Sequence, residues 1–119
     1  MLRNPMDNRI EKIVFALSEK KAEDILVFDM RNKDYFVSTV VIATTMGERH
    51  GLSLLDYLKT ELKGAGEVFL NVDADDNWTV IDMGDILIHL MTPTYRSKYN
   101  LELFLKEREE EMKRVRATV

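Results

Sequence analysis

WTVIDMGDILIHLM, residues 78–91, contains two β-prone apolar runs that are joined at Met83-Gly84. Val, Ile and Leu dominate both runs, and glycine supplies the positive φ that a tight turn needs. The stretch therefore predicts a β-hairpin with Met83 and Gly84 in its loop and with Asp82 facing Asp85. Met83 is an unusual first residue for such a loop, so a different turn type or a bulge is the alternative. Met83 is expected to lie exposed at the tip, where a methionine is an adaptable contact for a partner.

The second run, residues 86–91, is apolar at nearly every position, which predicts a central strand covered on both faces. Its polar residue, His89, is interpreted as a hydrogen-bonded, half-buried side chain packed near Trp78, its partner across the predicted hairpin. The alternative, a metal ligand, lacks a second ligand, because the other histidine, His50, lies near the start of a distant helix.

The composition indicates one soluble globular domain. A chain of 119 residues can bury a single core but is too short for two ordinary domains, and 45% apolar residues exclude a disordered chain. A formal charge of −4 argues against broad attraction to nucleic acid or anionic lipid. The chain has no cysteine, which excludes thiol catalysis. We expect no signal peptide and no membrane span, so the expected location is cytoplasmic.

The remaining patterns predict the order helix, two strands, helix, three strands, helix. The predicted helices cover residues 7–17, 47–63 and a stretch starting near Leu101. The predicted strands cover residues 25–28, 35–45, 67–72, 78–82 and 85–91. This order indicates a single α/β domain with a mixed five-stranded sheet flanked by helices. The domain is expected to span residues 1–105, and residues 106–119 form a charged C-terminal helical extension or tail.

Asp73, Asp75 and Asp82 raise the hypothesis of a magnesium-dependent nucleotidyltransferase, because an Asp-x-Asp at a strand end can hold magnesium. A phosphate-binding glycine loop is missing, however. GAG at residues 64–66 follows a helix and precedes a strand, the reverse of the required order, and TTMGERH at residues 44–50 has only a single glycine. No serine lies in an elbow motif. We therefore expect no enzyme activity, no cofactor and no metal.

Two longer stretches, VVIATTMGERH and WTVIDMGDILIHLMTPTYRSKYNLELF, resemble the ribosomal silencing factor family, also called the Iojap-like or RsfS family. The family pattern falls on Trp78, Asp82, Gly84, Asp85, His89, Arg96, Tyr99, Leu101 and Glu102. KKAEDILVFDM resembles the family's entry strand, with Lys21, Ala22, Asp24 and Asp29 at the expected places. The resemblance spans residues 10–105. The joint pattern is specific, although each piece alone is weak.

Two departures from the family pattern concern the surface. The family usually carries Asp-Tyr-Phe immediately before Val-Ile-Ala-Thr, whereas here Ser-Thr-Val stands at residues 38–40 and Asp34-Tyr35-Phe36 lies four positions upstream. VDADDN replaces a glutamate-glycine turn, so contacts made by that turn are not carried over. The tail beyond Leu105 has no counterpart in the shorter members.

The resemblance implies a nucleotidyltransferase-like fold without the catalytic loop. It also implies binding to the large ribosomal subunit through its ribosomal protein fourteen at the intersubunit face. The small subunit then cannot join, and translation is restrained when nutrients fail. Such steric exclusion requires only an interface and no cofactor. A net acidic domain suits a basic ribosomal protein, with little direct nucleic-acid contact and no membrane.

An aromatic anchor with a charged rim is how many interfaces concentrate binding energy. The predicted docking residues are Trp78, Asp82, Met83, Asp85, Arg96 and Tyr99. The alternative is that Trp78 packs on the sheet and that Arg96 and Tyr99 hold the last helix against the hairpin. A homodimeric interaction module, paired through the sheet or the terminal helix, is a further hypothesis.

Overall fold

A computed structural model describes residues 5–31 and 35–108 of the chain. The elements are α1 Pro5–Glu19, β1 Glu23–Asp29, β2 Thr39–Thr44, α2 Glu48–Gly64, β3 Asn71–Asp73, β4 Trp78–Asp82, β5 Ile86–Met91 and α3 Pro93–Tyr99. Residues 101–108 form a further helical segment after α3. The predicted order of helices and strands is confirmed.

Within the described residues the strands form one five-stranded sheet in the order β1-β2-β5-β4-β3. β2 and β5 are parallel, and the other neighbouring strands are antiparallel, so the sheet is mixed as predicted. Every residue of β2 is buried, and in β5 only His89 is half-buried. The apolar runs thus form the two strands that are covered on both faces, as predicted.

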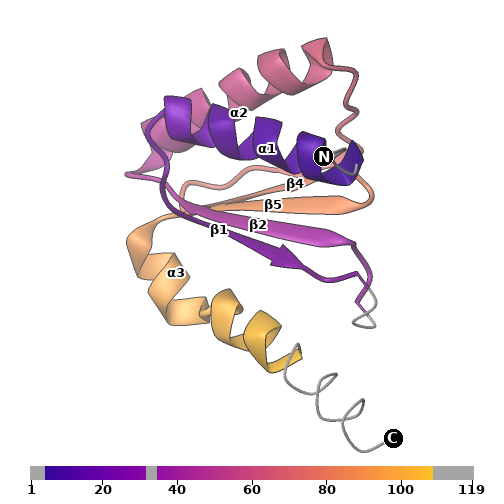
Figure 1. Cartoon of the computed structure of the whole chain (residues 1–119). Helices are drawn as coiled ribbons and strands as arrows, with labels where there is room; N and C mark the ends of the chain where they lie inside the picture. The colour runs from indigo at the N-terminus through magenta and orange to yellow at the C-terminus, as the bar shows by residue number, and fades with distance from the viewer. Residues whose placement is uncertain (1–4, 32–34, 109–119) are drawn as a thin grey trace, which may run out of the picture.

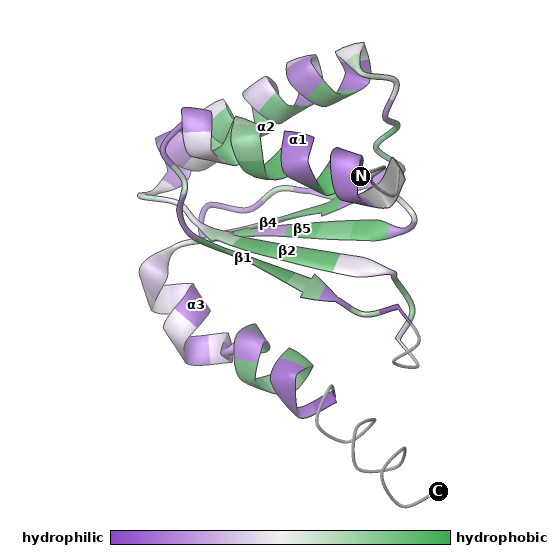
Figure 2. Ribbon diagram, in the orientation of Figure 1, coloured by the Kyte–Doolittle hydropathy of each residue, from purple (hydrophilic) through white to green (hydrophobic). Residues whose placement is uncertain are grey.

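Helices cover both faces of the sheet. α1 and α2 lie on one face, and α3 with residues 101–108 lies on the other (Figure 1). The apolar sides of α1 and α2 face the strands, and their polar sides face outward (Figure 2). Each face therefore has its own core, centred on Leu58 and Ile88 on one side and on Ile42 and Met91 on the other.

Two predicted elements differ from the structure. The strand expected at residues 67–72 covers only Asn71–Asp73, because the preceding residues follow the turn that ends α2, where the Glu67 amide bonds back to the Leu62 carbonyl. The last helix begins at Pro93, earlier than predicted. A proline is favourable at the first helical position, because it lacks an amide that would be unpaired there anyway.

Several predictions concern residues outside the described part of the chain. Asp34 of the displaced Asp-Tyr-Phe segment and residues 109–119 of the predicted extension lie there, so the division at residue 105 stays a prediction. Between residues 5 and 108, leaving out residues 32–34, no helix is long and apolar enough to cross a bilayer.

Candidate functional site

The hairpin between β4 and β5 closes in a different register from the predicted one. Asp82 pairs with Leu87, and the loop residues are Gly84 and Asp85, so the prediction that Asp82 faces Asp85 is wrong. Gly84 has a φ of +91° at the first loop position, which is the pattern of a type II′ turn. Its amide donates to Asp82 Oδ1 at 2.8 Å. The two carboxylates therefore do not repel each other across the strands.

Met83 is not at the tip of the hairpin. Its amide donates to the Ile86 carbonyl at 2.9 Å, so it still belongs to the paired part of the hairpin. The side chain is 7% exposed and packs in the core beneath α1 and α2. The prediction of an exposed docking methionine is wrong, because the shifted register turns this side chain inward.

The Asp85 carboxylate is bound by Arg9 of α1. Arg9 Nη1 and Nη2 donate to Asp85 at 2.5 and 3.1 Å, and Nε and Nη2 donate to Glu67 at 2.7 and 2.8 Å. The hydrogen bonds from Arg9 hold the pKa of Asp85 below its usual value. This clamp joins α1, the loop after α2 and the hairpin loop. The sequence analysis missed Arg9 and Glu67.

Trp78 and His89 form a hydrogen-bonded pair on the face of the sheet that α3 covers. The Trp78 indole Nε1 donates to His89 Nδ1 at 3.0 Å, so the proton of the neutral imidazole lies on Nε2. Burial lowers the pKa of His89 to about 4. The predicted half-buried histidine beside Trp78 is confirmed, although His89 pairs across the hairpin with Val80 rather than with Trp78.

Acidification is expected to destabilise the fold through His89. An unfolded histidine titrates near 6.5, whereas the folded pKa is about 4, so the unfolded chain takes up the proton first. The free energy of unfolding is unaffected above about pH 6.5 and falls by at most roughly 3 kcal/mol as the pH drops toward 4. Urea unfolding at several pH values measures this loss.

His89→Gln is the matched control for this pH dependence, because glutamine does not titrate and its amide oxygen can accept the Trp78 indole hydrogen. The variant should lose distinctly less stability than the natural chain between about pH 6.5 and 4.5. Equal losses in the two proteins would show that His89 does not cause the effect.

An aromatic cluster extends from Trp78 to the surface of α3. The ring centroid of Tyr99 lies 5.1 Å from that of Trp78 and 5.6 Å from that of Tyr95. Lys98 Nζ lies over the Tyr99 ring at 5.3 Å, and Tyr99 is 47% exposed. We call Trp78, Tyr95 and Tyr99 the aromatic cluster. In this cluster the exposed Tyr99 ring packs against the rings of Trp78 and Tyr95.

Arg96 holds α3 to the sheet and is only 9% exposed. Its Nη1 donates to the Asp24 carbonyl at 2.6 Å and to Thr44 Oγ1 at 2.7 Å. Its Nε donates to Glu102 Oε1 at 2.6 Å. One side chain thus ties α3 to β1, to the end of β2 and to the helical segment that follows. This geometry supports the alternative holding role for Arg96 rather than a direct contact with a partner.

The structure divides the predicted docking residues between the two ends of β4. Trp78 lies with Tyr99 and Arg96 at one end, whereas Asp82 and Asp85 lie at the other, four residues or about 13 Å along the strand. Asp85 is also bound to α1, on the opposite face from α3. The residues therefore do not form one continuous edge.

The residues weighed for metal binding lie apart. Asp73 and Asp75 are exposed at β3 and in the turn that follows it. His50 Nδ1 accepts from the Met46 amide at 2.9 Å, and its Nε2 lies 2.6 Å from the Lys20 carbonyl. Both ring nitrogens of His50 therefore contact the backbone. In the described stretches, 5–31 and 35–108, no three His, Asp or Glu residues group closely enough to hold a metal ion.

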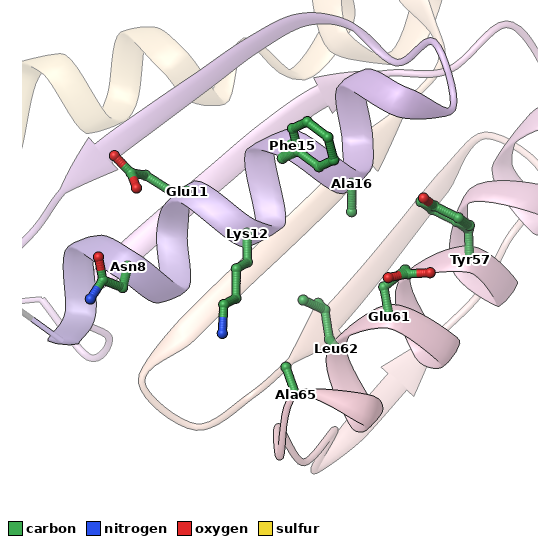
Figure 3. A pocket seen from close by; sticks show the side chains of 9 residues that line it. All are labelled: Asn8, Glu11, Lys12, Phe15, Ala16, Tyr57, Glu61, Leu62 and Ala65. Atoms are coloured by element: carbon green, nitrogen blue, oxygen red, sulfur yellow. The ribbon is translucent and has the colours of Figure 1, made fainter.

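A groove of about 730 Å³ runs between α1 and α2 on the other face of the sheet (Figure 3). Phe15 and Ala16 line it from α1, and Tyr57 and Leu62 line it from α2. Charged side chains from both helices stand at its rim. The sequence did not predict this groove.

Several known sequences resemble this chain over most of its length. Residues 4–119 match the family model described as ribosomal silencing factor during starvation, RsfS. A protein of Haemophilus influenzae named ribosomal silencing factor RsfS is 30% identical over 95 residues, which cover 78% of this chain and 93% of that protein. The chloroplastic protein Iojap of Zea mays is 33% identical over 94 residues, which cover 75% of this chain and 40% of the plant protein.

A solved structure shares the fold. A crystal structure of a Chromobacterium violaceum protein superposes with a TM-score of 0.80 at 23% identity and covers 87% of this chain and 88% of its own. The arrangement of sheet and helices is therefore one that an experimentally determined protein also adopts.

Proposed function

The chain belongs to the ribosomal silencing factor (RsfS) family, and from this premise we propose that it binds the large ribosomal subunit and prevents the small subunit from joining it. The proposed contact is ribosomal protein fourteen of the large subunit. The observation that carries the proposal is the family match over residues 4–119. The relatives are named as silencing factors rather than as enzymes, and steric exclusion needs no catalysis. We propose the cytoplasm as the location, because ribosomes act there.

We propose the aromatic cluster as the centre of the docking surface. Tyr99 is the exposed ring, and Trp78 supports it from the sheet. The exposed carboxylates of Asp73, at the end of β3, and of Asp75 and Asp76, in the turn that follows, lie shortly before Trp78 in the sequence. An aromatic centre beside an acidic turn complements a basic protein surface. Asp82 stays in the proposal as a more distant acidic contact, and Arg96 positions α3 from within.

Tyr99→Ala is expected to weaken binding to purified large subunits about tenfold or more while the fold persists. The reason is that the substitution removes a half-exposed ring at the proposed centre and leaves the ion pair of Arg96 in place. Cosedimentation over a range of subunit concentrations gives the dissociation constant, and circular dichroism checks the fold.

Phe15→Ala is the matched control, because it removes an aromatic ring that is 65% exposed on α1, on the opposite face of the sheet. Its binding should equal that of the natural chain. Unchanged binding of Tyr99→Ala would remove the aromatic cluster from the docking surface, and loss of binding in Phe15→Ala would move that surface to the helical face.

A further inference from the structure

β1 leaves one edge of the sheet open. Among the described residues its only strand partner is β2, and it is the outermost strand. It is seven residues long, whereas β3 at the other edge has three. A long open edge strand is a ready template for another extended chain. The position is also distinct from the proposed docking surface, because β2 and β5 separate β1 from β4.

The backbone of Val27 points toward this open edge. The Met30 amide donates to the Ser38 carbonyl at 2.8 Å, which continues the β1–β2 register. In an antiparallel pair, hydrogen-bonded and non-bonded positions alternate. Counting back from Met30, Phe28 is bonded to β2 and Val27, which lies opposite Val41, is not. The amide and carbonyl of Val27 are therefore directed away from β2.

The part of β1 around Val27 also lacks the usual protection of an edge. Val27, which is 44% exposed, faces the α1 side, and its exposed neighbour Leu26 faces the other side. Natural edges are often protected by lysine, proline or a bulge. β1 contains neither lysine nor proline, and its register shift is confined to the stretch between Glu23 and Leu26. An added strand would cover apolar area on both faces.

A socket of about 230 Å³ adjoins Val27, between α1 and the edge of β1. Ile10 of α1 and Val27 supply its apolar wall. The charged residues that line it are Asp7, Glu11, Asp29 and Arg31. Arg31 binds Asp29 within this lining, and three carboxylates against one guanidinium leave the lining with a net negative charge. The socket therefore favours an apolar side chain that is flanked by positive charge.

We propose that the open edge of β1 binds an extended segment of a basic protein partner as an added strand. Val27 supplies backbone hydrogen bonds, the socket receives one apolar side chain, and lysine or arginine on either side meets the carboxylates. A second copy of β1 is the poorer occupant. β1 carries three acidic residues and no basic one, so a pair of such strands would bring like charges together.

The test uses the full-length ¹⁵N-labelled chain and two synthetic peptides, Thr-Lys-Val-Lys-Val-Lys-Thr and the same peptide with glutamate in place of lysine. Titration with the lysine peptide should give saturable amide shifts centred on Val27 and should slow its hydrogen exchange. The glutamate peptide should bind at least tenfold more weakly at low salt, because the lining is acidic.

Two substitutions of Val27 make the test specific. Val27→Pro removes the outward amide at an edge position that tolerates proline, and Val27→Lys fills the socket while keeping the amide. Each should weaken peptide binding at least tenfold. Val68→Lys introduces the same change at an exposed valine on the β3 side of the sheet and should bind like the natural chain.

Three results would overturn the proposal. The first is the absence of saturable shifts at β1 with the lysine peptide, or shifts centred elsewhere. The second is unchanged binding by Val27→Lys. The third is protection of Val27 that grows with protein concentration in the absence of peptide, which would make a second copy the occupant. None of these results depends on whether the chain binds ribosomal subunits.

Discussion

Arg96→Ala is expected to lower the free energy of unfolding by about 3 kcal/mol. Arg96 is buried and bonds to Glu102, Thr44 and the Asp24 carbonyl. Alanine leaves the half-buried Glu102 carboxylate without its closest cation, and it leaves two oxygens without a donor. One oxygen of Glu102, Oε2, already lacks a hydrogen-bond partner, and Lys106 is then the remaining cation that stabilises the carboxylate.

Urea unfolding at neutral pH measures this loss. Lys98→Ala is the control, because it removes a cation from the exposed side of the same helix and should change the stability by less than about 0.5 kcal/mol. Arg96→Lys should lie between the two, since an ammonium retains the charge but not the planar set of donors. A loss below about 1 kcal/mol for Arg96→Ala would contradict the holding role.

Trp78→Ala is expected to cost about 3 kcal/mol of stability and to weaken large-subunit binding more than tenfold. The indole packs with Val80 against the core on the face that α3 covers and contacts Tyr99, and its Nε1 is the hydrogen-bond donor to His89. Removing it creates a cavity, leaves Nδ1 of the half-buried His89 without its donor and removes the ring that supports Tyr99.

Trp78→Phe separates these contributions. Phenylalanine keeps most of the ring contact with Tyr99 but cannot donate to His89, so the stability should fall by only about 1 kcal/mol and binding should change little. Unfolding midpoints and cosedimentation, measured on the same preparations, give both quantities. If Trp78→Phe loses binding as completely as Trp78→Ala, the indole itself contacts the partner, and the supporting role assigned to it is wrong.

The layers of this fold were predictable from the sequence because burial leaves a strong pattern. The run at residues 40–42 and the run at residues 86–91 are apolar on both faces, and only a strand covered on both sides accommodates that. The half-buried state of His89 followed from the same argument. The family resemblance depended on residues that the structure then placed at fixed positions, such as Gly84 in its turn and Arg96 in its buried contacts.

The hairpin register was not predictable because glycine accepts a positive φ at either loop position. Placing Gly84 first or second in the loop moves every pairing, and it decides whether Met83 lies at the tip or in the core. Composition alone does not separate the two, since the core contact of Met83 comes from helices that are distant in sequence.

The hydrogen bonds of Arg9 and Arg96 could not be predicted from the sequence either. Arg9 lies 58 residues from Glu67 and 76 from Asp85, and Arg96 lies 72 residues from Asp24. The spacing of helices and strands in the sequence does not link residues so far apart, and they come together only when the helices pack on the sheet. Asp85 and Arg96 were predicted as docking residues, with a holding role as the alternative for Arg96, and the structure shows both side chains bound within the chain.

Subunit joining tests the central claim most directly. Purified large and small ribosomal subunits are mixed in magnesium buffer with increasing amounts of the natural chain, without added nucleotide, and are separated on a sucrose gradient. We predict that the joined-ribosome peak falls as the chain comigrates with free large subunits, and that Tyr99→Ala requires about tenfold more protein for the same effect. Joining that proceeds undiminished while the large subunits are saturated with the chain would contradict steric exclusion.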